Sequence, residues 1–271
     1  MNGSDHIAVG GKPVAAPPGE RDGHKDPARR FFGRRKGPSL SARQQSLLAG
    51  VGRRIGIGVS SGEYPGALEP RDLFAGLEGG ADIWFEIGFG KGEHLAWQAA
   101  RNPDVGLIGC EPYLNGYVGL LDKIQDKGLG NVRAYADDAR HLLWRFPDAC
   151  LARVFLLHPD PWPKNRHAAR RFVRPDNLDL LARVMADGAE LRIGTDHPVY
   201  RRWTSVHMAA HPDFEWLAEG PDDWRTRPVD WPETRYEVKA LEGGATYFRY
   251  RRRCRRCAAA TATPANMAKT I

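Results

Sequence analysis

Short apolar runs alternate with amphipathic stretches through most of the chain. The runs predicted as strands are Ile83–Ile87, Gly106–Cys110, Val132–Ala136, Arg153–Leu157 and Ala189–Ile193. The stretches predicted as helices are Glu93–Arg101, Tyr113–Lys127, Ala139–Phe146, Pro175–Ala186 and Val199–Ala210. This alternation predicts βαβ units, and hence an α/β fold with helices on both faces of the sheet. Two late strands, Phe214–Leu217 and Thr246–Arg251, have no long helix between them. We therefore expect a mostly parallel, seven-stranded sheet with an antiparallel edge hairpin.

Length and composition allow one sizeable core. The chain has 271 residues, of which 42% are apolar, and no apolar run approaches the roughly 20 residues that cross a bilayer. We expect a cytoplasmic protein without a membrane segment or a secretory signal. Residues 1–28 are expected to form a disordered tail, 29–80 a basic extension with a helical lead-in, 81–253 the folded domain and 254–271 a second disordered tail.

Basic residues gather in three places. Lys and Arg number 40 against 33 Asp and Glu, and the clusters lie at 29–36, 164–174 and 249–256. Any one cluster could be a solvated run. Three of them together favour a polyanionic partner. One cluster contains Cys254 and Cys257, a single CxxC pair, whereas a structural zinc site needs four ligands, so we expect no metal.

A glycine loop follows the first strand. Gly88, Gly90 and Gly92 allow a ligand to approach the backbone closely and lead into the next helix. The dinucleotide fingerprint would need glycine where the chain has Glu93, and Glu86 would repel a pyrophosphate. These two features disfavour a nicotinamide oxidoreductase. Glu86 is suited instead to the cationic amino-acid part of a ligand.

Acidic residues follow the next two strands. Glu111 ends the second strand, where a carboxylate can accept both hydroxyls of a ribose. Asp137 and Asp138 follow the third strand, where they could meet an adenine amino group. Each acid alone could simply cap a helix. Together with the glycine loop they indicate a nucleoside cofactor without phosphates.

The fourth strand leads into residues 158–164, HPDPWPK. Prolines flank Asp160, so the loop is expected to be stiff and non-helical. It could present Asp160 to a reacting group, stack a base on Trp162 and place Lys164 against RNA. A surface turn with a structural aspartate is the alternative, and Trp162 could instead pack in the core.

Several motifs together resemble the bacterial tRNA (guanine-N7-)-methyltransferase family over about residues 31–252. The segments that carry the resemblance are residues 86–92 (EIGFGKG), 159–164 (PDPWPK), Arg166-His167 with Arg170-Arg171, Thr195-Asp196 and Thr234-Arg235-Tyr236-Glu237. The resemblance implies a Rossmann-like class I methyltransferase fold and methyl transfer from S-adenosylmethionine, with S-adenosylhomocysteine as product. The acceptor would be N7 of a guanine in the tRNA variable loop. After Asp196, His197-Pro198 departs from the expected start of a helix.

The resemblance also implies residue roles. The cofactor site would comprise Glu86, Gly88, Gly90, Glu111, Asp138 and Asp160, and Asp160 would also be catalytic. The guanine or its tRNA would contact Lys164, Asp196, Thr234, Arg235, Tyr236 and Glu237. The residues Thr234–Glu237 also match the capping-box pattern Thr-x-x-Glu, which predicts the start of a short helix. From the basic clusters we expect RNA-backbone contacts at Arg34, Arg35, Arg166, Arg170 and Arg171.

Two other functions fit the same fold. One is a small-molecule methyltransferase, for which the basic clusters would be incidental. The other is a non-catalytic RNA-binding protein, which would bind tRNA and ignore the cofactor. The sequence leaves both a monomer and a homodimer open.

Overall fold

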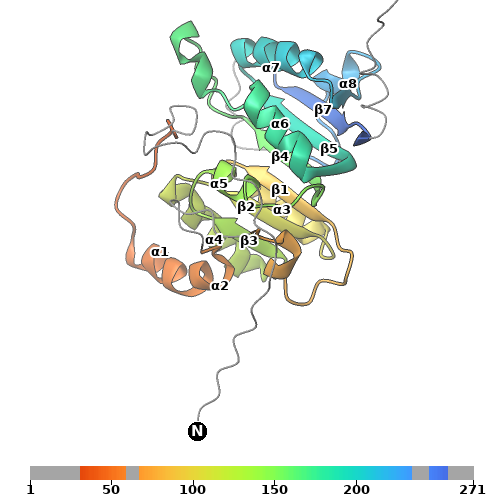
Figure 1. Ribbon diagram of the computed structural model, residues 1–271. Helices are drawn as coiled ribbons and strands as arrows, with labels where there is room; N and C mark the ends of the chain where they lie inside the picture. The colour runs from red at the N-terminus through yellow and green to blue at the C-terminus, as the bar shows by residue number, and fades with distance from the viewer. Residues whose placement is uncertain (1–30, 59–66, 234–243, 256–271) are drawn as a thin grey trace, which may run out of the picture.

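The computed structural model describes residues 31–58, 67–233 and 244–255. Within them the strands form one seven-stranded sheet in the order β3-β2-β1-β4-β5-β7-β6 (Figure 1). The strands are β1 Ile83–Ile87, β2 Gly106–Cys110, β3 Val132–Tyr135, β4 Leu151–Leu157, β5 Met185–Thr195, β6 Phe214–Trp216 and β7 Thr246–Arg252. Strands β1 to β5 pair in parallel, whereas β7 runs antiparallel to both β5 and β6. The predicted Rossmann-like α/β fold and its antiparallel edge are confirmed.

Helices cover both faces of the sheet. The longer helices are α3 Glu93–Arg101, α4 Leu114–Lys127, α6 Pro175–Val184 and α7 Pro198–Ala210. The shorter ones are α1 Ala42–Leu47, η2 Leu48–Gly52, α2 Arg53–Ile55, η3 Pro70–Leu73, α5 Ala139–Leu143, η4 Asn165–Arg170 and α8 Asp222–Arg225. One core holds buried residues of α5, α6 and α7 with Phe85, and the other holds those of α1 to α4 with Trp84. Successive residues of β1 thus face opposite layers, as the period of two requires.

The amino-terminal helices belong to the fold. Ser41 begins α1 with a capping box, in which its side chain and that of Gln44 each accept the other's backbone amide. The helices pack against α4, at the orange end of the molecule in Figure 1. Gly56 then pairs with Ala134 of β3, and the amide of Ile57 donates to the carbonyl of Ala134 at 2.9 Å. The segment predicted as an extension therefore lengthens one edge of the sheet.

Strand β5 begins earlier than the sequence indicates. The predicted helix 175–186 ends at Val184, and Met185 already pairs with Leu151 of β4. The next pair joins Arg153 to Glu190, so β5 carries extra residues around Gly188, whose φ is +83°. Pairing with the central strand β4 overrides the local helical pattern, since the irregularity lets β5 continue in the sheet.

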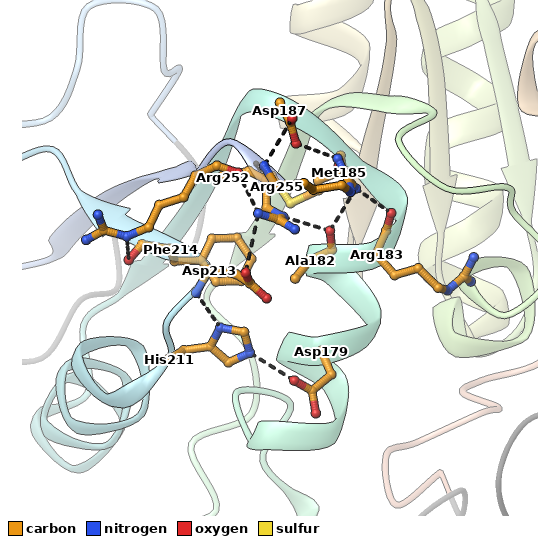
Figure 2. A network of polar contacts seen from close by, with 11 residues as sticks. Asp179, Ala182, Arg183, Met185, Asp187, His211, Asp213, Phe214, Arg252 and Arg255 are labelled. Carbon is orange, nitrogen blue, oxygen red and sulfur yellow. Dashed lines mark hydrogen bonds and ion pairs between the residues drawn. The ribbon is translucent and has the colours of Figure 1, made fainter. Parts of the chain in front are cut away.

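The carboxyl-terminal arginines are bound at the end of α6 (Figure 2). Arg252 donates to the carbonyl of Ala182 at 2.8 Å, and Arg255 donates to the carbonyl of Met185 at 2.8 Å and pairs with Asp187 at 2.5 Å. These guanidinium groups donate hydrogen bonds to backbone carbonyls that have no partner within the helix because they lie at its carboxyl end. Arg255, which the prediction assigns to the tail, thus contacts the folded domain, and residues 256–271 lie outside the described residues.

Candidate active site

A cavity of about 420 Å³ opens at the carboxyl ends of the parallel strands, a size typical of ligand pockets. It adjoins β1, which pairs with β2 on one side and β4 on the other, the point at which strand order reverses in such sheets. Five of the six predicted cofactor residues line it, namely Gly88, Gly90, Glu111, Asp138 and Asp160. Residues distant in the sequence are thus brought together as expected.

The glycine loop turns sharply and leaves room. Gly88, Gly90 and Gly92 have φ values of +72°, +58° and +73°, which favour glycine. A Cβ at Gly92 would lie 2.6 Å from a methyl carbon of Leu120, so this residue packs closely against α4. At Gly88 no atom beyond the residue itself and its two chain neighbours lies within 4 Å of a Cβ position. The loop is therefore tight against the helix and open beside the cavity.

Glu111 is one of two buried carboxylates in the cavity lining. It is 9% exposed, and its two oxygens accept hydrogen bonds from the backbone amides of Gly90 at 2.7 Å and Tyr113 at 2.8 Å. Burial raises the pKa of Glu111 to about 7, although the two amides act to lower it and the nearby Asp160 and Glu86 add to the rise. The carboxyl group therefore changes its charge near neutral pH.

Asp138 has two structural partners at the edge of the cavity. Its carboxylate accepts from the backbone amide of Arg140 at 2.9 Å, as the N-cap of α5, and from the Arg140 guanidinium at 2.6 Å. Burial opposes ionisation, but the hydrogen bonds and charge of Arg140 outweigh it and lower the pKa of Asp138. Asp138 thus stays ionised and fixed in position.

Glu86 lies apart from the cavity lining. Its side chain is buried on the α3 side of the sheet, where its carboxylate is 2.8 Å from Nδ1 of His94. Gln98 continues this chain, 3.1 Å from Nε2 of His94, and donates to the carbonyl of Asp230 at 2.8 Å. The structure thus joins Glu86 to the segment that leads toward residues 234–237. The predicted substrate residues Thr234, Arg235, Tyr236 and Glu237 lie outside the described residues.

The loop after β4 has a strained backbone on both sides of Asp160. His158 and Trp162 have φ values of +47° and +41°, which side-chain-bearing residues rarely adopt. Such strain persists only where surrounding contacts impose the conformation, and it is common at active sites. Asp160 is exposed at the mouth of the cavity. The surrounding protein nevertheless removes part of the water around its carboxyl group, and this desolvation raises its pKa. The predicted stiff loop therefore has a geometry that presents Asp160.

Arg171 fixes this loop from inside. It is 3% exposed and donates to the carbonyl of Pro161 at 3.1 Å and to that of Trp162 at 2.8 Å. Its guanidinium also lies 4.4 Å from the ring centroid of Trp203 on α7. Because these contacts occupy the side chain within the protein, we propose a positioning role for Arg171 in place of the phosphate contact.

The other predicted contact residues lie at η4 and just after β5, and among them Arg170 lines the cavity. Lys164 and Arg166 are exposed at η4, and Arg170 stacks between the rings of Phe32 and Trp162, 4.7 and 4.8 Å from their centroids. At the end of β5, a carboxylate oxygen of Asp196 lies 3.7 Å from Nδ1 of His158. The dipeptide His197-Pro198, which differs from the helix start that the resemblance predicts, stands at the beginning of helix α7. His197 is its N-cap and Pro198 its first residue, which is a favourable place for proline.

The amino-terminal segment crosses the same region. Residues 31–34, including the predicted Arg34, line the cavity, while Arg35 pairs with Asp137 at 2.7 Å. The amide of Leu114 donates to the carbonyl of Arg35 at 2.9 Å and holds the segment near the start of α4. The sequence indicated the charge of this segment but not that Phe31 and Phe32 would form a wall of the cavity.

Two further residues at the site were given no role from the sequence. His158 begins the HPDPWPK motif, and Arg140 follows Asp138 by two residues. The only signal for either is its nearness to a predicted acid. In the described part of the chain, no group of three or more His, Cys, Asp and Glu side chains is arranged to hold a metal ion. The same described residues contain no helix of the length and hydropathy that crossing a membrane requires.

A family model and sequence relatives both match most of the chain. Residues 81–250 match the model of a family described as "Putative methyltransferase". The tRNA (guanine-N(7)-)-methyltransferase of Rhodospirillum rubrum is 49% identical, and the match covers 83% of this chain and 89% of that protein. The protein of the same name from Zymomonas mobilis is 50% identical, over 83% of this chain and 94% of its own length. Among solved structures, an S-adenosylmethionine-dependent O-methyltransferase from Thermotoga maritima matches 65% of this chain and 60% of its own, with 15% identity and a TM-score of 0.43.

High identity over nearly the full length of these relatives accords with the motifs and the cavity that the structure assembles from them. The chain belongs to the tRNA (guanine-N(7)-)-methyltransferase family.

Proposed function

We propose that this chain transfers a methyl group from S-adenosylmethionine to N7 of a guanine in the variable loop of tRNA, in the cytoplasm, where tRNA acts. The observation that carries the proposal is the placement of Asp160 at the mouth of a cavity that also contains Glu111 and the glycine loop. Members of one such family share a reaction and a substrate, and the relatives of this chain are named for methyl transfer to guanine N7 of tRNA.

The residues of the cavity fit S-adenosylmethionine. The open side of Gly88 leaves space for a ligand against the backbone, and Glu111 offers carboxylate oxygens to ribose hydroxyls. Glu86 is engaged by His94, so its role would be to shape the loop rather than to touch the ligand. When bound, S-adenosylmethionine supplies a methyl group on a positively charged sulfur, ready for attack by a nucleophile.

Guanine N7 carries a lone pair and no proton, so it needs no strong base. The protein must mainly hold N7 in line with the methyl carbon, which is catalysis by proximity. Asp160, and Asp196 near it, can accept hydrogen bonds from the Watson–Crick edge of the guanine. A carboxylate there also favours the positive charge that the guanine acquires.

The loop supports this task through its rigidity. Arg171 holds the carbonyls on either side of Trp162, and the prolines limit the backbone around Asp160. The guanine must leave its stack in the tRNA to enter the cavity, at a cost of a few kcal/mol. Arg166 and Arg170 at the mouth would repay part of this cost through contacts with phosphates.

Methyl transfer to unmodified tRNA tests the proposal directly. The tRNA is incubated with the protein and methyl-labelled S-adenosylmethionine, digested and analysed by mass spectrometry. We expect label in 7-methylguanosine, mapped to the variable loop. Calorimetric binding of cofactor without any transfer to tRNA, or label at another nucleotide, would contradict the proposed reaction.

A further inference from the structure

A second hollow lies behind the loop that carries Asp160. It measures about 570 Å³ and is formed by η4, the start of α6 and one side of α7. In Figure 1, η4 is the short green helix that projects beside α7. We call this hollow the flanking groove. Its walls include Phe32, Arg166, Ala168, Pro175, Trp203 and His207. Phe32 and Arg170 also line the active-site cavity, so the two spaces share a wall.

The walls of the flanking groove are apolar, aromatic and well fixed. The indole of Trp203 donates a hydrogen bond to the carbonyl of Val173. The His207 ring stacks on Trp203 with centroids 3.9 Å apart and planes 29° apart, and its Nδ1 lies 2.9 Å from the carbonyl of Trp203. A prearranged aromatic wall loses little conformational entropy when a flat ligand stacks against it.

The rim of the groove is cationic. Within the described residues, neither Arg166 nor Arg170 forms an ion pair with a carboxylate, whereas Arg174 is paired with Asp176. Arg170 stands in the shared wall, between the rings of Phe32 and Trp162. An aromatic hollow with arginines at its edge matches a nucleotide, whose base is flat and whose phosphate is anionic.

We propose that the flanking groove receives the base of the nucleotide next to the methylated guanine. The inference rests on the proposed function, because it requires a guanine in the active-site cavity. Withdrawal of that guanine from its stack removes one of the two bases against which the neighbouring base stacks. The shared wall places the groove next to the cavity, and Arg166 and Arg170 lie where the connecting phosphates would pass. The groove then lowers the cost of opening the tRNA.

Two variants test the groove without altering the active-site cavity. Ala168→Trp fills the groove from η4, and Ala168 does not line the active-site cavity. His207→Glu places an acid in the groove, and Val206→Glu adds the same charge on the neighbouring, 58% exposed residue of α7, outside the lining. We expect a rise of about fivefold or more in the KM for tRNA with Ala168→Trp and His207→Glu, since one stacked base is lost. Val206→Glu should change KM less than twofold, as it leaves the groove intact.

Fluorescence identifies the nucleotide. The analogue 2-aminopurine replaces the nucleotide on one or the other side of the target guanine in synthetic tRNA, and emission is recorded on binding with S-adenosylhomocysteine present. We expect the wild-type protein to change the emission at one of the two positions and Ala168→Trp to abolish that change. Unchanged emission at both positions, or an equal change with Ala168→Trp, would overturn the proposal, as would equal KM values for His207→Glu and Val206→Glu.

The outcome separates this proposal from the proposed function. Calorimetry with S-adenosylmethionine and the melting temperature establish that each variant is folded and binds cofactor. If the wild-type protein methylates guanine N7 and the variants do so with unchanged KM for tRNA, only the flanking groove is refuted. Absence of methylation by the wild-type protein itself would refute the proposed function, and the inference with it.

Discussion

At the scale of single residues, two of the three carboxylates that line the cavity, Glu111 and Asp160, have very different surroundings. Glu111 is buried and accepts two backbone amides, whereas Asp160 is exposed on a strained loop. A buried acid held by the backbone is suited to a fixed ligand, and an exposed acid at the mouth is suited to an incoming base. These differences support the proposal that Glu111 holds the cofactor and Asp160 acts in catalysis.

Asp160→Asn removes the negative charge while it keeps the size of the side chain. We expect kcat to fall about 100-fold or more, because the charge that favours the methylated guanine is lost. The Kd for tRNA should change less than about threefold. Asp104→Asn is the matched control, since Asp104 is exposed at the turn before β2, at the opposite end of the strand from the cavity. Equal losses in kcat and in tRNA affinity would instead indicate a structural role for Asp160.

Glu111 predicts a pH dependence of cofactor binding. Its pKa in the free protein is about 7, and ribose hydroxyls would bind the ionised carboxylate. Cofactor affinity should therefore increase as pH rises through about 7, and binding near pH 6.5 should release protons. Titration calorimetry in two buffers with different ionisation enthalpies measures this release. It should vanish in Glu111→Gln, and its persistence there would exclude Glu111 as its source.

The same group affects folding in the opposite direction. A raised pKa means that the folded state holds the proton more tightly than the unfolded state does. The contribution of Glu111 to stability is therefore fully present below pH 4.5 and is lost as pH rises through about 7. Tighter cofactor binding and lower stability of the free protein should accompany each other across this range.

At the scale of elements, the loop after β4 depends on its support. Arg171 contacts both this loop and Trp203 of α7, so the position of α7 helps to fix the residues around Asp160. The glycine loop is similarly supported, since Gly92 packs directly against Leu120 of α4. Helices on both faces of the sheet thus determine the shape of the cavity.

Arg171→Lys keeps the charge but loses the paired hydrogen bonds to the loop. We expect kcat to fall about tenfold or more, and the free energy of unfolding to fall by about 2 kcal/mol. The salt dependence of tRNA binding should stay the same. Arg201→Lys, on the exposed side of α7, should alter none of these quantities. Because lysine keeps the charge, the phosphate role is tested with Arg171→Gln, for which a weaker salt dependence of tRNA binding than in the wild type would restore that role.

At the scale of the whole molecule, the basic clusters differ in how many of their arginines pair with carboxylates of the fold. The carboxyl-terminal cluster is largely paired within the fold, as Arg249 with Glu190, Arg251 with Glu215 and Arg255 with Asp187. In the cluster near the cavity, Arg166 and Arg170 have no carboxylate partner in the described part of the chain. Of these two clusters, the one beside the active-site cavity therefore has the arginines that are better placed to meet RNA.

The double variant Arg166→Ala with Arg170→Ala tests this distribution. We expect the slope of log Kd for tRNA against log salt concentration to decrease by about 1 to 2, because two phosphate contacts are lost. Arg251→Ala is the control, since its guanidinium faces Glu215 at 3.8 Å, and its slope should match the wild type. The slopes are measured by filter binding at about 50 to 300 mM salt, a range of about sixfold in salt concentration. Equal slopes in all three proteins would refute an RNA-backbone role for Arg166 and Arg170.

Local patterns in the sequence are enough to predict the class of fold and most of the cavity lining. Strand and helix patterns follow from local periodicity, so every predicted strand is present and β4 is central, with boundaries that differ by a few residues. Parallel strands bring their carboxyl ends to one edge, and for that reason Gly88, Glu111 and Asp138 could be placed together from their positions alone.

The partners of individual side chains, in contrast, depend on contacts that form only in the folded chain. Local sequence does not encode which distant partner a charge meets, so Arg171 and Arg170 look alike in the chain, yet one is buried against the loop and the other lies at the mouth. Glu86 turned toward His94, and Arg255 joined the end of α6, for the same reason. Burial and pairing depend on contacts across the fold, and these separate a residue that shapes the site from one that meets the substrate.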